Sequence, residues 1–263
     1  MQSYKTDYLL RDENAVFEVA VLSALGDREE QQDSAGIQLK TDEGLVVVCD
    51  GMGGHAGGQT ASTLATEVFL NSYLSEYPCG DIRSWLIDTV NDADSRVAKL
   101  QTAEGTPMNA GSTAASVFIR GDNLFWLSVG DSRIYLFRNG ELVRATADHN
   151  YATLLQHQLD TGEIDDAAYQ EKIGQGEALV SFLGMNGIPY MDANDVPFAL
   201  QCGDKILLTT DGLYKLISDE GIKNILTNFE NAEDALTALE MKARKIGKTT
   251  VRDNMTVALI KVK

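Results

Sequence analysis

Two apolar runs in this chain end in the same Asp-Gly dipeptide. The first run (LVVVC) leads into Asp50, the second (ILLTT) leads into Asp211, and a Gly follows each Asp. Short runs rich in Val, Ile, Leu and Thr are typical of buried β-strands. The pattern therefore predicts two carboxylates at the rigid edge of a sheet, each followed by a Gly that allows a turn and leaves a carbonyl unshielded.

Each acidic strand end has a simpler interpretation when it is taken alone, because Asp-Gly is a common turn dipeptide. A third carboxylate, Asp253, stands beside Asn254 late in the sequence. Three carboxylates placed in this way provide the oxygen ligands that a hard divalent cation requires. Together they favour a metal site over three unrelated turns.

The charge of the chain limits its partners. The 263 residues carry a formal net charge of −17. Nucleic-acid backbones and anionic membrane surfaces both attract clustered Lys and Arg, so the sequence argues against both as partners. An acidic protein that handles phosphorylated substrates needs local positive charge, and metal ions are the obvious source.

Length and cysteine content favour a single intracellular domain. No low-complexity tract or Pro/Ser-rich linker divides residues 1–263, so one compact domain is expected. Cys49, Cys79 and Cys202 are far apart and lack CxxC spacing, which suits a reducing compartment and supports neither disulfides nor a zinc site. The chain shows no apolar stretch of about 20 residues and no apolar signal-peptide core. We therefore expect a cytoplasmic monomer.

The pattern of apolar residues predicts strands in blocks and helices in pairs. Strands are predicted at 17–23, 34–39, 45–49, 112–119, 124–129, 133–137, 141–145, 178–182, 205–210 and 255–262, and helices at 59–74, 82–100, 218–227 and 232–246. The four strands between 112 and 145 are predicted to form an antiparallel meander, since hairpin signals separate them. This order favours an α+β fold with antiparallel sheets covered by helices.

Several polar motifs have both a functional and a structural interpretation. The glycine-rich loop 50–58 lacks the Lys-Ser/Thr of a nucleotide-binding P-loop, so its glycines are interpreted as allowing backbone to pack near a metal–water cluster. Arg28 can bind a phosphoryl group with its guanidinium fork, or can pair with nearby Glu at the surface. Asp33 and Asp131 can be turn residues, and Asp148-His149-Asn150 can form a helix N-cap.

Taken together, these motifs resemble those of the metal-dependent protein serine/threonine phosphatases, the type 2C or PPM family. They occur in the order and approximate spacing of that family: Arg28 to Asp33, Asp50-Gly51-Met52-Gly53-Gly54-His55, Gly111-Ser112-Thr113, Gly130-Asp131-Ser132-Arg133, Thr210-Asp211-Gly212 and Asp253-Asn254. The resemblance runs from about 17 to 262, and the glycine-rich motif is similar to that of bacterial members. It implies a central β-sandwich of two antiparallel sheets flanked by helix pairs.

The resemblance also implies a site for two Mg²⁺ or Mn²⁺ ions at one edge of the sandwich. Asp50 is implied to bridge the two ions, and the Gly51 carbonyl to bind one of them. Asp211 and Asp253 are implied to bind the other ion. Asp33 is implied to hold metal-bound water.

Three further assignments follow from the family pattern. Asp131 matches the residue that, with Asp211, binds a third and weaker ion in bacterial members. Arg28 is implied to grip the substrate phosphate. Residues 148–187 cover the family's mobile flap, which shapes substrate choice.

The family chemistry is hydrolysis of phosphoserine or phosphothreonine in proteins phosphorylated by a Ser/Thr kinase. Two ions about 3.5–4 Å apart yield a bridging hydroxide near neutral pH. The hydroxide attacks phosphorus in line with the leaving oxygen, while the ions and Arg28 offset charge on the equatorial oxygens. No covalent phosphoenzyme is needed.

Two departures from the family pattern keep alternatives open. Gln32 stands where many members have Glu, and Met52 stands where eukaryotic members place a candidate general-acid His. His55 or a metal-bound water is left as the candidate acid. One alternative is a pseudophosphatase that binds phosphoproteins without turnover. The other is a two-metal phosphodiesterase or nuclease, against which the net charge of −17 argues.

Overall fold

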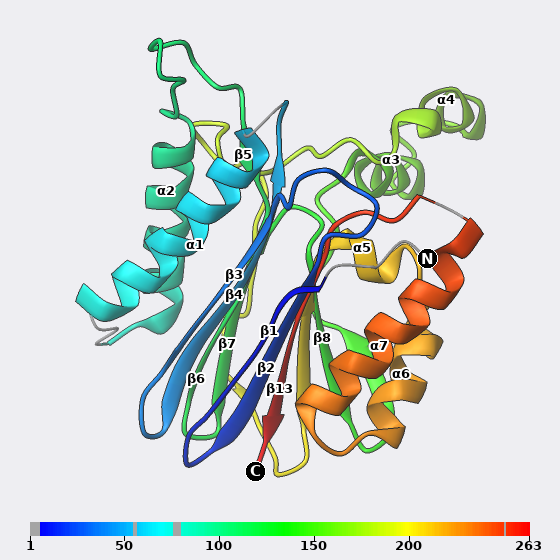
Figure 1. Cartoon of the computed structure of the whole chain (residues 1–263). Helices are drawn as coiled ribbons and strands as arrows, with labels where there is room; N and C mark the ends of the chain where they lie inside the picture. The colour runs from blue at the N-terminus through cyan, green and yellow to red at the C-terminus, as the bar shows by residue number, and fades with distance from the viewer. Residues whose placement is uncertain (1–5, 55–56, 76–79, 250) are drawn as a thin grey trace.

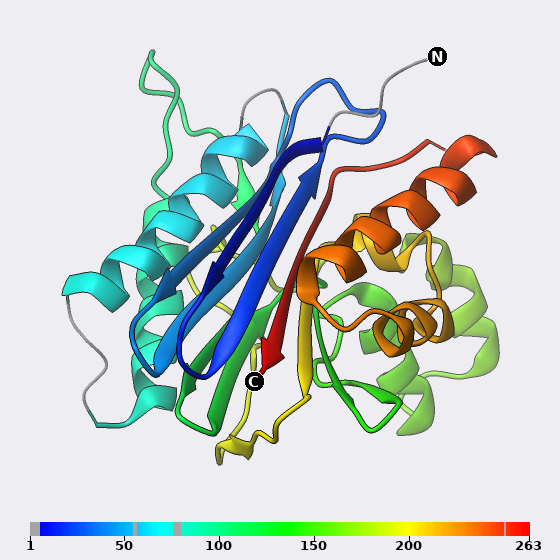
Figure 2. The same cartoon turned by 60° about the horizontal axis from the view of Figure 1, so that its bottom comes forward.

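The computed structural model describes residues 6–54, 57–75, 80–249 and 251–263. Within them two antiparallel sheets pack face to face, as Figure 1 shows. Across the six-stranded sheet the order is β1 (Thr6–Glu13), β2 (Phe17–Ala24), β13 (Met255–Val262), β12 (Lys205–Thr209), β8 (Arg133–Arg138) and β9 (Glu141–Arg144). In Figure 2 the C-terminal strand β13 (red) runs between β2 and β12.

The second sheet has seven strands in the described part of the chain. Its order is β10 (Asp192–Ala193), β7 (Asn123–Val129), β6 (Ala114–Arg120), β4 (Glu43–Met52) and β3 (Asp33–Leu39), with β11 (Phe198–Ala199) paired to β7 and β5 (Gly111–Ser112) paired to β4. The two sheets and the helices outside them form four layers, which confirms the predicted α+β sandwich.

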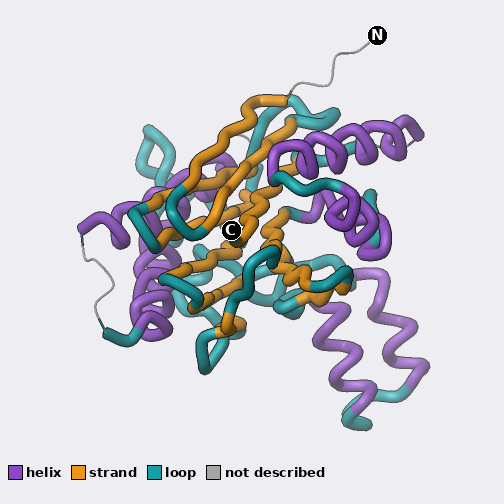
Figure 3. Tube along the Cα trace, turned by 90° about the horizontal axis from the view of Figure 1, so that it is seen from below, coloured by secondary structure: helices purple, strands orange, loops and turns teal. Residues whose placement is uncertain are grey.

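Helices cover the outer face of each sheet. The described helices are α1 (Gly57–Ser75), α2 (Ile82–Val97), α3 (Tyr151–Asp160), α4 (Asp166–Lys172), α5 (Asp211–Tyr214), α6 (Asp219–Asn228) and α7 (Ala232–Ile246), with 3-10 turns η1 (Ile173–Gln175) and η2 (Gly247–Thr249). The α1–α2 pair packs on the seven-stranded sheet and the α6–α7 pair on the other. Figure 3 shows α3 and α4 projecting from the body as a hairpin.

Alternation along the strands divides the core into layers. In β4, Leu45 and Val47 pack against the α1–α2 side, whereas Val46 and Val48 pack between the sheets. Successive side chains of a strand point to opposite faces, so this division follows directly from the sequence. The core between the sheets also contains Leu208 of β12.

Two expectations about secondary structure are wrong, and one edge strand was not predicted. Residues 178–182 form no strand, because their backbone makes single bridges, such as Asn150 to Leu179, on the way to the buried Leu183. The meander is divided between the sheets, since β7 belongs to one and β8 to the other. The edge strand β1 was not predicted, because its residues are largely polar or exposed and do not alternate clearly.

None of the helices that the structure describes combines the length and apolar character needed to cross a bilayer. Cys49 and Cys202 are free thiols, the first buried and the second exposed. Cys79 lies outside the described residues.

A buried carboxylate ties α2 to the loop after the α3–α4 hairpin. Asp94 is 4% exposed. Its Oδ1 accepts N–H bonds from Gly184, Met185 and Asn186 at 2.7–3.2 Å, and its Oδ2 accepts one from Gly187 at 2.7 Å. The carboxylate thus satisfies four consecutive backbone donors at once.

We predict that Asp94→Ala lowers the free energy of unfolding by about 2–4 kcal/mol, because it leaves several backbone donors without their charged acceptor. Urea denaturation measures the change. Asp92→Ala is the matched control, since Asp92 is an exposed carboxylate on the same helix and pairs with Arg96. We expect the control to change stability by less than about 0.5 kcal/mol. Equal effects would contradict the role assigned to Asp94.

Candidate metal centre

Two carboxylates face each other where the layer between the sheets ends. Asp33 of β3 lies directly opposite Asp50 of β4 in the strand register. Asp50 follows Val46 and Val48 in alternation, so it belongs to the face that packs between the sheets. Thr210 continues β12 in the same way, and its Oγ1 donates to Asp33 Oδ2 at 2.9 Å. The apolar layer between the sheets therefore ends in a polar cluster, to which one sheet contributes Asp33 and Asp50 and the other contributes Thr210.

The two Asp-Gly pairs do not form turns. Asp50 and Gly51 lie within β4, and Asp211 and Gly212 begin α5. Neither glycine has a positive φ. Both positions instead need glycine because a Cβ would lie 2.0 Å from the Gly58 carbonyl oxygen at Gly51, and 1.9 Å from the Asn254 carbonyl oxygen at Gly212. The glycines permit the close approach of two backbones that brings the carboxylates together.

Asn254 organises the loop that carries Arg28. The side-chain amide donates to the Leu25 and Glu30 carbonyls at 2.9 and 3.0 Å, and its Oδ1 accepts the Gln32 N–H at 2.8 Å. It is 5% exposed. This clamp holds the 25–32 loop next to Asp253.

Burial and neighbouring negative charge raise the pKa of Asp33 and Asp50. Burial and then the charges of Asp33, Asp211, Asp131 and Asp253 raise the pKa of Asp50 well above its ordinary value. Burial, opposed by the hydrogen bond from Thr210, raises the pKa of Asp33 to about 8. Each carboxylate is therefore in the electrostatic range of the others, and the cluster favours bound positive charge.

Two cations of the chain already contact the cluster. Arg28 Nη2 lies 2.6 Å from Asp253 Oδ2, and Lys215 Nζ lies 2.8 Å from Asp211 Oδ2. In these positions, no three Asp, Glu, His or Cys side chains of the described residues are arranged tightly enough to hold an ion as they stand. The donor set is nevertheless made of carboxylate and carbonyl oxygens, which are the ligands of Mg²⁺ and Mn²⁺.

A cavity of about 630 Å³ opens over the cluster. Its lining residues are Arg28, Glu29, Glu30, Gln32, Asp50, Gly51, Met52, Gly53, Asp211, Asp253 and Asn254. Asp33 lies beneath it, 7% exposed. The fold thus brings together the predicted residues Arg28, Asp33, Asp50, Asp211 and Asp253. His55 lies outside the described residues.

Asp131 lies where the chain crosses from one sheet to the other. Gly130 and Asp131 follow β7, and β8 begins two residues later in the opposite sheet, so the segment is not the hairpin turn that the pattern suggested. Burial and the charge of Asp211 raise the pKa of Asp131 to about 6, while Lys215 opposes the rise. Asp131 is therefore next to the cluster on the side of the α3–α4 hairpin.

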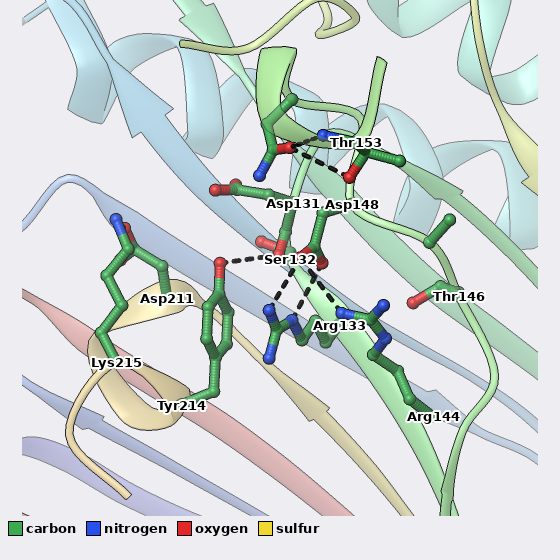
Figure 4. A network of polar contacts seen from close by, with 12 residues as sticks. Asp131, Ser132, Arg133, Arg144, Thr146, Asp148, Thr153, Asp211, Tyr214 and Lys215 are labelled. Carbon is green, nitrogen blue, oxygen red and sulfur yellow. Dashed lines mark hydrogen bonds and ion pairs between the residues drawn. The ribbon is translucent and has the colours of Figure 1, made fainter. Parts of the chain in front are cut away.

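A polar network joins this crossing to the hairpin (Figure 4). Arg133 donates to both oxygens of Asp148 at 2.9 and 2.7 Å, and its guanidinium stacks 3.5 Å from the Tyr214 ring centroid. Asn150 caps α3 as expected, accepting the Thr153 N–H at 3.0 Å. Asp148, which had been grouped with that cap, instead forms the ion pair.

Comparison with known proteins decides the family. The model of the family described as protein phosphatase 2C matches residues 23–256. The chain belongs to the protein phosphatase 2C family. The family prediction is thereby confirmed, and the chain is a homologue of protein serine/threonine phosphatases.

Bacterial members of the protein phosphatase 2C family are similar over most of the chain. The serine/threonine phosphatase stp of Listeria monocytogenes is 28% identical over 239 residues, covering 89% of this chain and 90% of that protein. PstP of Mycobacterium tuberculosis is 31% identical over 218 residues, covering 83% of this chain but 40% of that longer protein.

Solved structures agree with the fold. The S. agalactiae serine/threonine phosphatase has a TM-score of 0.77 and 28% identity, covering 94% of this chain and 100% of that one. The PstP catalytic domain, solved in complex with two manganese ions, has a TM-score of 0.72 and 30% identity, covering 94% and 98%. The two-sheet, helix-covered fold is thus that of protein phosphatase 2C.

The sequence analysis assigned no role to three residues that support this protein phosphatase 2C site. Thr210, Asn254 and Lys215 each contact a residue of the cluster or its loop. Thr210 and Asn254 belong to the acidic motifs themselves, and that position was the signal that could have indicated their roles. Nothing in the sequence signals Lys215, because its contact depends on the helical start at Asp211.

We predict that stability without divalent ions falls as pH rises from 5 to 8. The folded pKa of Asp33 (about 8) lies above its ordinary value of 3.8, so the folded state binds more protons than the unfolded state in this window. Asp131 acts with the same sign. We expect a loss of roughly 1–3 kcal/mol, measured by urea denaturation in EDTA.

Asp33→Asn isolates the contribution of this one group. The variant should lose a clear part of the pH dependence, because an amide does not titrate. Saturating Mn²⁺ should also stabilise the wild type most at the upper end of the window. An Asp33→Asn curve parallel to that of the wild type would contradict the assignment.

Proposed function

We propose that the chain is a metal-dependent phosphatase that hydrolyses phosphoserine and phosphothreonine in proteins. The observation that supports this proposal is that Asp50, Asp211 and Asp253 line one cavity together with Arg28. Asp33 lies opposite Asp50 in the strand pairing. Membership of the family and the two manganese ions in the PstP catalytic domain support the same reading. The chain is proposed to act as one catalytic domain, with 148–187 as its flap.

We assign the following roles to the residues that would hold two Mn²⁺ or Mg²⁺ ions. Asp50 would hold both ions, and the carbonyl of Gly51 in the cavity lining would hold one of them. Asp211 and Asp253 would hold the other ion. Asp33, whose Oδ2 accepts a hydrogen bond from Thr210, would orient a water. When bound, the ions lower the pKa of a water and offset negative charge on the phosphoryl oxygens.

The chain's own groups provide orientation and charge. Arg28 is half exposed at the cavity rim, where its guanidinium can move from Asp253 to a substrate phosphate. Both Arg28 and Lys215 contact carboxylates that we assign to the ions, so the ions compete with these cations.

A phosphoprotein-binding protein without turnover is the second candidate, and Gln32 is the observation that favours it. Gln32 lines the cavity with a neutral amide, and its Oε1 lies beside Gly58 at the start of α1. The backbone of Gln32, however, still holds Gly51 in place, since the Gln32 carbonyl accepts the Gly51 N–H at 3.1 Å. We therefore favour the active enzyme.

We predict that phosphate release from a phosphothreonine peptide requires Mn²⁺ and is abolished by EDTA. Asp50→Asn should lower kcat/KM by about 10²–10³-fold, because the bridging carboxylate is lost. Asp92→Asn, an exposed carboxylate on α2, is the control and should leave the rate unchanged. No release by folded wild type in any metal would favour the binding protein. Undiminished hydrolysis by Asp50→Asn would contradict the proposed site.

We further predict a preference for monoesters over diesters. The cavity rim carries Arg28, which suits a terminal phosphate, and the net charge of −17 repels nucleic acid. The phosphothreonine peptide should be hydrolysed at least about 100-fold faster than bis(p-nitrophenyl) phosphate under the same Mn²⁺ concentration. The opposite order would support the phosphodiesterase alternative.

A further inference from the structure

Lys215 connects the acidic cluster to the α3–α4 hairpin. Its ammonium lies 2.8 Å from Asp211 Oδ2 and 2.5 Å from Glu177 Oε2. Lys215 follows directly on α5, which begins at Asp211, so the two residues are one helical turn apart. Glu177 comes from the loop after the hairpin and is 80% exposed in its side chain. The ammonium is therefore shared between the cluster and the surface.

The end of α5 is fixed in relation to Asp131. The hydroxyl of Tyr214 donates to the Asp131 carbonyl oxygen at 3.1 Å, and its ring packs against Arg133. Figure 4 shows Tyr214 between Lys215 and Arg133, with Asp131 above it. Lys215 follows Tyr214 in sequence, and its positive charge reaches Asp131 as well as Asp211.

We propose that the Lys215 ammonium acts as a built-in cation between Asp131 and Asp211, in place of a third divalent ion, so that this chain binds two ions. The inference rests on the proposed two-ion function and deepens it. It replaces the expectation that Asp131 and Asp211 hold a third ion. Lys215 is a positioning residue, because it acts through Asp211 and does not touch the reacting atoms.

The geometry gives the reason. An ammonium in contact with Oδ2 of Asp211 excludes a divalent ion from that oxygen and repels one nearby. Oδ1 of the same carboxylate would remain available to an ion that Asp253 would also hold. Glu177 supplies a second anionic contact that keeps the ammonium in place. One carboxylate can thus serve the proposed two-ion centre on one side and Lys215 on the other.

The number of Mn²⁺ ions bound per chain tests the inference. Electron paramagnetic resonance of free Mn²⁺ counts the ions, and isothermal titration gives their affinities. Wild type should bind two ions. Lys215→Gln should bind a third ion, with an affinity at least about tenfold higher than that of any third ion bound weakly by wild type. Lys215→Arg, which keeps the charge, should bind two. Because the Lys215 side chain is half exposed, we expect wild type, Lys215→Gln and Lys215→Arg to fold alike.

A double variant locates the gained ion. Lys215→Gln combined with Asp131→Asn should return to two ions, because the carboxylate facing Asp211 is removed. Glu177→Gln should still bind two, since the contact with Asp211 remains. A third ion in wild type, or no gain in Lys215→Gln, would overturn the inference.

Phosphopeptide hydrolysis measured on the same samples tests the proposed phosphatase function separately from the role of Lys215. Two bound ions without turnover in wild type would contradict the proposed function, while the ion counts would still decide the role of Lys215. Turnover that persists with three ions bound to wild type would contradict the role of Lys215 alone. Absence of Mn²⁺ binding in every chain would overturn both.

Discussion

Mutual repulsion among carboxylates buried at one end of the sandwich is the interaction on which the rest of the site depends. Asp33 and Asp50 are held face to face by strand pairing, which neither side chain can relax without breaking backbone hydrogen bonds. Their raised pKa values express that constraint. Arg28 and Lys215 offset part of this negative charge by pairing with Asp253 and Asp211. The cavity over the cluster has room for further cations.

The two halves of the site are built by different means. Regular strands provide Asp33 and Asp50, so the pleat determines the direction of their side chains. Asp211 and Asp253 come from a helix start and a loop, which pack together only because Gly212 lacks a Cβ. Precision in the second half therefore comes from close backbone contact and from the Asn254 clamp, rather than from a sheet.

Sequence patterns predicted what depends on local periodicity. Short apolar runs predicted the strands β4 and β12, and the acidic dipeptides at their ends indicated the site. The patterns failed where tertiary contacts decide: the edge strand β1 has no apolar face to reveal it, and 178–182 is apolar because it leads to buried Leu183, not because it pairs. The Asp94 clamp and the Lys215 contact join residues whose proximity only the folded chain creates.

The position of β13 has a consequence for synthesis. This strand is synthesised after both of its neighbours, yet it lies in the interior of its sheet, between β2 and β12. Until it emerges from the ribosome, those two strands present open edges to solvent, and neither Asp253 nor Asn254 is in place. A nascent chain that stops before Asp253 would lack that carboxylate, the Asn254 clamp and the strand that joins β2 to β12, so the sheet and the acidic cluster are completed together when this segment pairs.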